Sequence, residues 1–127
     1  MAFDWNDFLT LASVLAPHLD EASKRTAISR AYYCVFNLAY ARAESNVGRR
    51  PQGVPSHSWC WDQYKRTPDV TCAQLGNTGD RLKRMRRLAD YNSLPIPRLD
   101  DRVERVVQDA RRFLGDLANL DARYPQP

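Results

Sequence analysis

The chain has few of the residues that build disulfide-stabilised, metal-binding or membrane-spanning proteins. It contains only three cysteines and two histidines among 127 residues. Three cysteines cannot all pair, and the N-terminus lacks the basic and apolar leader of a secreted protein, so we expect a reduced, cytoplasmic protein. No apolar run approaches the roughly 18 residues that a membrane helix needs, and we therefore expect no membrane partner.

Strand patterns, internal repeats and low-complexity segments are also missing, which leaves helices as the building blocks. The composition is 43% hydrophobic and 27% charged, as in an ordinary globular domain that can bury its own core. The net charge of +4 is a mild basic bias. It is compatible with a nucleic-acid or nucleotide partner, but it is too small to argue for one by itself.

The segment from Arg25 to Glu44 is apolar almost all the way round, which predicts a long helix in the middle of a bundle. Shorter stripes predict helices at about 5–15, 57–66, 70–91 and 101–120. The expected architecture is an all-α, up-and-down bundle of four main helices and one short helix. It forms a single domain of residues 1–127, with a flexible loop at about 45–55 and a polar tail from about 122.

Several helix ends are predicted from local chemistry. Ser56 is a candidate N-cap for the third helix, and Asp100 or Asp101, with Glu104, forms a candidate capping box for the last one. Two glycines weaken the first half of the fourth helix, which we expect to be frayed or bent. They are Gly76 and Gly79.

The fourth helix carries five basic residues within seven positions, and two interpretations of them are open. They are Arg81, Lys83, Arg84, Arg86 and Arg87. In one interpretation they form a solvated face, and Arg86 makes an ion pair with Asp90 one turn later. In the other, Arg86, Arg87 and Tyr91 bind a phosphate while Asp90 orients a guanidinium. Lys83 and the loop residues Arg49 and Arg50 are further candidates for contacts with RNA or another anion.

Two sequence motifs together resemble the small prokaryotic HEPN-domain proteins. They are SRAYYCVF at Ser29–Phe36 and LKRMRRLADYN at Leu82–Asn92, joined through a Gly/Pro loop and the pair Ser56-His57. The resemblance extends from about Asp20 to Leu120. It implies a bundle that homodimerises and holds a polar site at the dimer cleft. Many such proteins are metal-independent endoribonucleases of toxin–antitoxin or phage-defence systems with a nucleotidyltransferase-like partner, whereas others bind nucleotides or scaffold larger complexes.

The motif departs from the family's ribonuclease signature, in which an Arg is followed four to six residues later by a His. Here Arg86 is followed by Tyr91, and no histidine comes after it. A tyrosine titrates near pH 10 and is a poor acid or base at neutral pH. Two functions therefore stay open. The first is an endoribonuclease toxin or defence effector that uses Arg86, Tyr91, Asp90 and His57; the second is a non-catalytic bundle that binds RNA or nucleotide, or scaffolds a complex.

The remaining polar candidates have a structural and a functional interpretation each. His57 is either a local polar residue at a helix start or an acid or base for the Arg86 face. Arg30 either pairs with Asp90 to lock two helices or, with Asn37, supports Arg86 from behind. Cysteines near His57 do not complete a metal-ligand set, so we expect neither metal nor cofactor.

Aromatic residues concentrate in the first two-thirds of the chain, where Trp59, Trp61 and Tyr64 follow a tyrosine-rich helix. This is more aromatic surface than one small core readily uses, and it predicts a homodimer.

Overall fold

The computed structural model describes the backbone of residues 2–123 and the side chains as far as residue 120, and it is helical throughout. The helices are α1 (Asn6–Leu15), α2 (Glu21–Val47), α3 (Ser56–Lys65), α4 (Val70–Tyr91) and α5 (Leu99–Arg123). The predicted all-α bundle is confirmed. Three of the helices are long and two are short, rather than four and one, because α1 and α3 each end after 10 residues.

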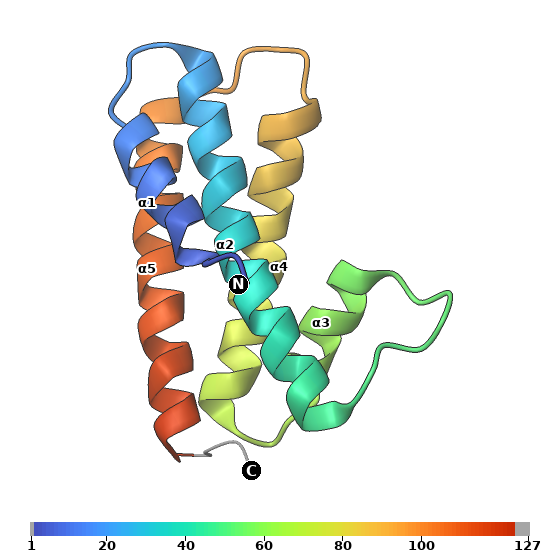
Figure 1. Ribbon diagram of the computed structural model, residues 1–127. Helices are drawn as coiled ribbons and strands as arrows, with labels where there is room; N and C mark the ends of the chain where they lie inside the picture. Colours follow the sequence, from blue (N-terminus) through green and yellow to red (C-terminus); the bar gives the residue numbers. More distant parts are fainter. Residues whose placement is uncertain (1, 124–127) are drawn as a thin grey trace.

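The three long helices α2, α4 and α5 pack against one another along the length of the molecule (Figure 1). Helix α1 lies against α2 and, to a smaller extent, α5, whereas α3 packs mainly on α4 and on the C-terminal half of α2. Helix α2 therefore contacts each of the other four helices. The prediction that this apolar helix is the spine of the bundle is confirmed.

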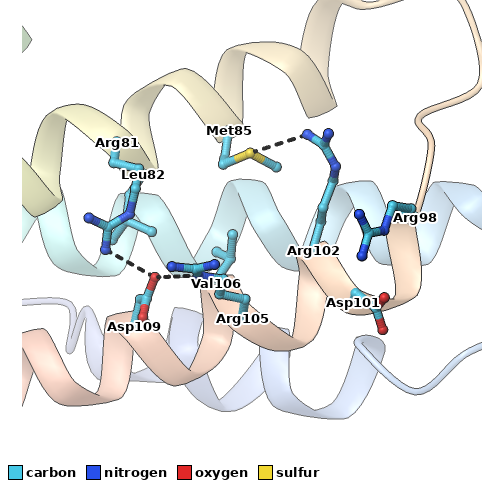
Figure 2. Close-up of a pocket in the computed structure, with 9 residues that line it drawn as sticks. All are labelled: Arg81, Leu82, Met85, Arg98, Asp101, Arg102, Arg105, Val106 and Asp109. Carbon is cyan, nitrogen blue, oxygen red and sulfur yellow. Dashed lines mark hydrogen bonds and ion pairs between the residues drawn. The ribbon is translucent and has the colours of Figure 1, made fainter.

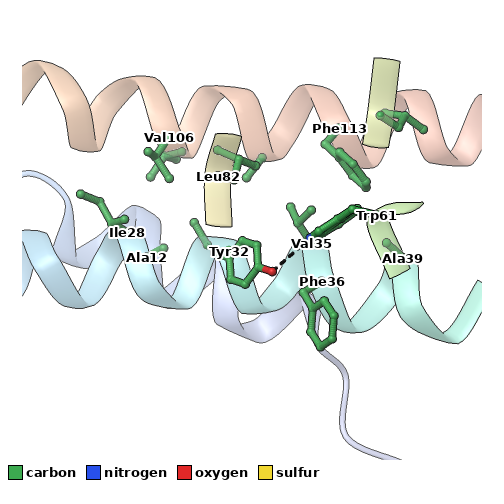
Figure 3. Packing of buried hydrophobic residues seen from close by; sticks show 14 of the residues in the cluster. Ala12, Ile28, Tyr32, Val35, Phe36, Ala39, Trp61, Leu82, Val106 and Phe113 are labelled. Carbon is green, nitrogen blue, oxygen red and sulfur yellow. Dashed lines mark hydrogen bonds between the residues drawn. The ribbon is translucent and has the colours of Figure 1, made fainter. Parts of the chain in front are cut away.

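The core is built from the inward faces of these helices around α2 (Figure 3). Its largest fully buried side chains include Trp61, Tyr32, Phe113, Ile28 and Leu82. Complete burial of each large apolar side chain contributes about 1.5–3 kcal/mol. The short helix α3 thus contributes the bulkiest core residue, Trp61. The N-terminal end of α3 lies beside α2.

Helix α4 is continuous from Val70 to Tyr91, so the expectation of a frayed first half is wrong. Both of its glycines are buried. A Cβ atom at Gly79 would lie 2.3 Å from Cε3 of Trp61, and one at Gly76 would lie 2.9 Å from the carbonyl oxygen of Trp61. The glycines let α3 approach α4 closely, and the packing of Trp61 offsets their low helix propensity.

Two of the predicted helix starts are wrong by a residue or more. Ser56 is the first residue of α3 and not its cap. Helix α5 begins at Leu99, so Asp100 and Asp101 lie inside its first turn instead of capping it. There they complement the positive end of the helix dipole. Leu99 is buried, and its place in the core explains why the helix starts earlier than the polar pattern indicated.

The loop after α2 is joined to the helix that precedes it. The Arg50 side chain donates hydrogen bonds to the Val54 carbonyl and, over 3.2 Å, to the Tyr40 hydroxyl. Gly48 and Gly53 have positive φ angles of 108° and 84°, which glycine adopts without strain. The predicted flexibility of this loop stays a prediction, and residues 124–127 of the predicted polar tail lie outside the described residues.

The aromatic residues that suggested a homodimer are used inside one chain. Trp59, Trp61, Tyr64 and Tyr32 are all buried in the core. The aromatic residues of α3 are therefore not in surplus, because α3 folds its aromatic face onto α2 and α4, and the homodimer stays a prediction. In the part of the chain that the structure describes, no helix combines the length and the apolar character needed to cross a bilayer.

Candidate functional site

Arg86 projects from α4 toward the tyrosine pair of α2 and is almost completely buried, with 8% of its side chain exposed. Its guanidinium carbon lies 5.6 Å from the ring centroid of Tyr32, 5.4 Å from that of Tyr33 and 5.8 Å from that of Tyr91. A guanidinium at such distances is attracted by the negative face of each ring. Three aromatic rings from two helices thus enclose one cation.

Asp90 provides the negative charge of the site. Its Oδ2 atom lies 3.7 Å from Nη1 of Arg86 and accepts a hydrogen bond of 3.2 Å from the Ser29 hydroxyl. The predicted ion pair between Arg86 and Asp90 is confirmed. Asp90 therefore holds one edge of the guanidinium and also links α4 to α2.

Arg30 does not pair directly with Asp90, and that prediction is wrong. Its guanidinium lies over the rings of Phe8 and Tyr33, at 4.7 Å and 5.2 Å, and donates a weak 3.4 Å hydrogen bond to Ser29. The side chain packs toward α1, so Ser29 is the residue that reaches Asp90. Among the side chains that the structure describes, Arg30 contacts the site only through Ser29 and Tyr33.

One hydrogen-bond donor of the Arg86 guanidinium is unsatisfied. The Nε atom is buried and has no hydrogen-bond partner among the described residues. A buried donor without a partner costs about 1–3 kcal/mol, and more when the group is charged. Such groups are rare in native proteins and call for an explanation, and a role in binding a ligand is one.

His57 lies at the start of α3 and packs into the same cluster. Its ring stacks on Phe36 at 4.0 Å and 10°, and its Nδ1 atom is 2.6 Å from the Tyr32 hydroxyl. Burial, followed by the positive charges of Arg86 and Lys83, lowers the pKa of His57 to about 4. The imidazole is therefore neutral at pH 7, and it is close enough to Arg86 and Lys83 to sense their charges.

The hydrogen bonds around Tyr32 indicate which nitrogen of His57 carries the proton. The Trp61 indole can only donate, and its Nε1 donates to the Tyr32 oxygen over 3.2 Å. Burial also raises the pKa of Tyr32 far above its usual range, so the phenol keeps its hydrogen. The phenol is therefore best placed to donate its hydrogen bond to Nδ1 of His57, so that Nδ1 is the acceptor and Nε2 of the neutral ring carries the hydrogen and is a donor.

The other predicted site residues are distributed unevenly around this cluster. Tyr91, the last residue of α4, is 75% exposed, and Arg87 is exposed beside it. Arg49 and Arg50 belong to the loop after α2, and Arg50 is engaged within that loop. The Asn37 amide donates a hydrogen bond of 2.7 Å to the Tyr33 carbonyl, which lies one turn earlier in the same helix. Of the predicted site residues, the structure places Asp90 and Tyr91 against Arg86, and it links His57 to Arg86 through Tyr32.

Sequence reasoning missed the residue that fixes the C-terminal end of α4. Arg25 donates from Nη1 to the carbonyls of Ala89, at 3.2 Å, and Asn92, at 2.5 Å, and from Nη2 to the Leu94 carbonyl at 2.7 Å. Its Nε is held by Glu21 at 2.8 Å. These carbonyls would otherwise lack partners at a helix end. Only the i,i+4 spacing of Glu21 and Arg25 was visible in the sequence, and it gave no hint of α4.

Tyr32 and Tyr33 were also missed as site residues, since an aromatic pair in an apolar helix indicates core packing. Tyr32 is fully buried, yet its hydroxyl connects Trp61 and His57. The one signal was their position beside Ser29 and Arg30 within the SRAYYCVF motif.

No group of three or more His, Cys, Asp or Glu side chains in the described part of the chain is arranged to hold a metal ion. Comparison with protein-family models, with curated proteins and with solved structures finds no match for the chain.

Proposed function

We propose that this protein is a HEPN-type helical bundle that binds single-stranded RNA without cleaving it, with a backbone phosphate held at Arg86. The observation that carries this proposal is the Nε donor of Arg86, which is buried and has no partner among the described residues. A guanidinium binds a phosphate through parallel N–H groups, and Asp90 occupies only the Nη1 side of it. The proposed ligand oxygen would accept the hydrogen bond from Nε once the exposed Tyr91 ring, which borders the guanidinium, has moved aside.

The surroundings of Arg86 fit a phosphate on electrostatic grounds. Lys83 and Arg87 add positive charge on the same helix, and the charges of Lys83 and Arg86 both reach His57. In the tautomer favoured by the Trp61–Tyr32 chain, His57 offers a further N–H donor. The exposed ring of Tyr91 beside this cluster is a platform on which a base can stack, as in many proteins that bind single strands.

The proposal is tested with Arg86→Gln, using Arg84→Gln as the matched control on the same helix. Both variants lose one charge, but Arg84 is exposed and lies outside the cluster. We expect Arg86→Gln to weaken binding of a labelled single-stranded oligonucleotide by about tenfold and to reduce the salt slope by about 0.7, the value for one lost phosphate contact. Fluorescence anisotropy over a series of salt concentrations measures both quantities.

Thermal unfolding of the two variants completes this experiment. Because Arg86 is buried, its loss can affect folding, and affinities are compared at a temperature where both variants are folded. Equal weakening by the two substitutions would show that only net charge matters, and the Arg86 site would be rejected. A large loss of stability with unchanged affinity would identify Arg86 as a purely structural residue.

Metal-independent endoribonuclease activity is a second candidate, which one specific observation favours. His57 and Arg86 are 29 positions apart in the numbering, but both contact Tyr32. His57 on α3 would thus replace the histidine that the ribonuclease signature has after the Arg, and that α4 lacks. This candidate requires the other tautomer of His57, with a free lone pair on Nε2 to take the proton of the 2′-hydroxyl. In this case a toxin or defence role with a nucleotidyltransferase-like antitoxin follows from the resemblance.

The ribonuclease candidate predicts a particular pH profile. Since the neutral imidazole is the base and its pKa is lowered to about 4, cleavage should rise through pH 4 and be level from about pH 6 to 9. His57→Gln should abolish it, and EDTA should have no effect. A rate that still increases above about pH 8 would point to Tyr91 as the base. If the purified protein cleaves no single-stranded RNA between pH 5 and 9, the non-catalytic proposal stands alone.

A further inference from the structure

A basic hollow outside the Arg86 cluster lies between α4 and α5. It has a volume of about 390 Å³, within the range of small-molecule sites. We call it the α4–α5 groove (Figure 2). Its lining residues are Arg81, Leu82, Met85, Arg98, Asp101, Arg102, Arg105, Val106 and Asp109.

The charged residues at one end of the groove are paired. Asp109 lies 3.1 Å from Nη2 of Arg81 and 3.9 Å from Nε of Arg105, and it joins α5 to α4. One carboxylate pairs with two guanidinium groups, so this end of the groove has a net positive charge. The remaining basic residues lie toward the N-terminus of α5, as Figure 2 shows.

At that other end, two guanidinium groups have no carboxylate within ion-pair distance among the described residues. Arg98, which has a φ angle of +56°, precedes α5, and Arg102 lies one turn further along. Within the described part of the chain, the only side chain to which Arg102 donates is Met85, with 3.8 Å between Nη1 and Sδ. A thioether is a weak acceptor, so almost all the hydrogen-bonding capacity of this half-buried cation is unused.

The groove also has an apolar wall. Leu82 and Val106 form its floor and are nearly completely buried, while Met85 is half-buried beside Arg102. Four arginines and two aspartates give the groove a formal charge of +2. A phosphate monoester carries a charge of about −1.5 to −2 at pH 7 and accepts hydrogen bonds at three oxygens.

We propose that the α4–α5 groove binds a small organic phosphate monoester with an apolar or aromatic body. In this site the phosphate bridges Arg98 and Arg102, and the apolar body lies on Leu82, Met85 and Val106. The site is separate from the RNA site proposed at Arg86, which faces α2.

The probe for this proposal is phenyl phosphate, and Met85 is the reporter. The chain has two methionines, so labelling their methyl groups with ¹³C gives two NMR signals, one of them inside the groove. We expect phenyl phosphate to shift the Met85 signal saturably, with a dissociation constant of about 1 mM, as for other fragment-sized ligands. Benzoate, with one charge, should bind about tenfold more weakly, and phenol should not bind.

Substitutions assign the contacts. Arg98→Gln and Arg102→Gln should each weaken phenyl phosphate binding about tenfold, whereas the exposed Arg84→Gln and the Arg86→Gln variant should leave it unchanged. Failure of the RNA proposal would therefore not affect this result. The proposal is overturned if phenyl phosphate gives no saturable shift of Met85 at about 10 mM, or if Arg102→Gln binds it like the wild type. Equal affinity for inorganic phosphate would show that the apolar wall takes no part.

Discussion

Replacing Trp61 with alanine should lower the free energy of unfolding by about 3–5 kcal/mol, the largest effect we expect from any single substitution in this chain. The indole is fully buried and makes an edge contact with Phe113 at 5.9 Å and a second one with Phe36 at 6.2 Å. Its removal would leave a cavity where the Trp61 side chain packs between α2, α4 and α5. The loss is a large part of the roughly 5–15 kcal/mol by which domains of this size are stable.

Trp5→Ala is the matched control, because it makes the same chemical change at a half-buried position. Trp5 contacts only Phe3 and Phe8 among the described ring pairs, near the N-terminus. We expect it to cost about 1–2 kcal/mol, in proportion to the smaller apolar area that it buries. Urea unfolding followed by circular dichroism gives both values. Equal losses for the two tryptophans would show that α3 is not anchored in the core.

Trp61→Phe separates the packing of this residue from its hydrogen bond. Phenylalanine retains most of the apolar contact, but it cannot donate to the Tyr32 hydroxyl. Because that donor helps to set the direction of the Tyr32–His57 hydrogen bond, its loss leaves the His57 tautomer less defined. The tryptophan therefore links the stability of the bundle to the chemistry of the candidate site.

The sequence predicted the helices well where one face had to be apolar. The bounds of α4 agree with the prediction, and the unbroken apolar surface of α2 correctly placed it at the centre. The errors lie at helix starts and in the glycine segment. There, the burial of Leu99 and the approach of Trp61 to Gly79 decide the structure, and these long-range contacts leave no local signal.

The candidate site was predictable only along one helix. The Arg86–Asp90 pair follows from the i,i+4 spacing, and the structure has it. By contrast, Ser29, Tyr32 and Arg25 reach this region across more than 50 positions of sequence. Their roles depend on how α2 is rotated against α4, which is a property of packing and not of local pattern.

Gly79→Ala and Gly115→Ala should change stability in opposite directions, although both put the same methyl group into a helix. At Gly115, on the exposed side of α5, an added Cβ meets nothing within 4 Å. We therefore expect a gain of about 0.5–1 kcal/mol, because alanine has the higher helix propensity. At Gly79 the Cβ would lie 2.3–2.5 Å from three ring atoms of Trp61, and overpacking of this kind costs about 1–3 kcal/mol.

A double-mutant cycle shows whether Trp61 is the cause. With Trp61→Ala already present, the methyl group at position 79 enters the vacated space, so Gly79→Ala should no longer destabilise and should instead approach the gain seen at Gly115. The coupling between the two positions, measured from the four unfolding curves, should therefore be favourable and at least about 1 kcal/mol. Additive effects would mean that backbone conformation at Gly79, and not the ring of Trp61, requires glycine. In that case the close approach of α3 to α4 would need another explanation.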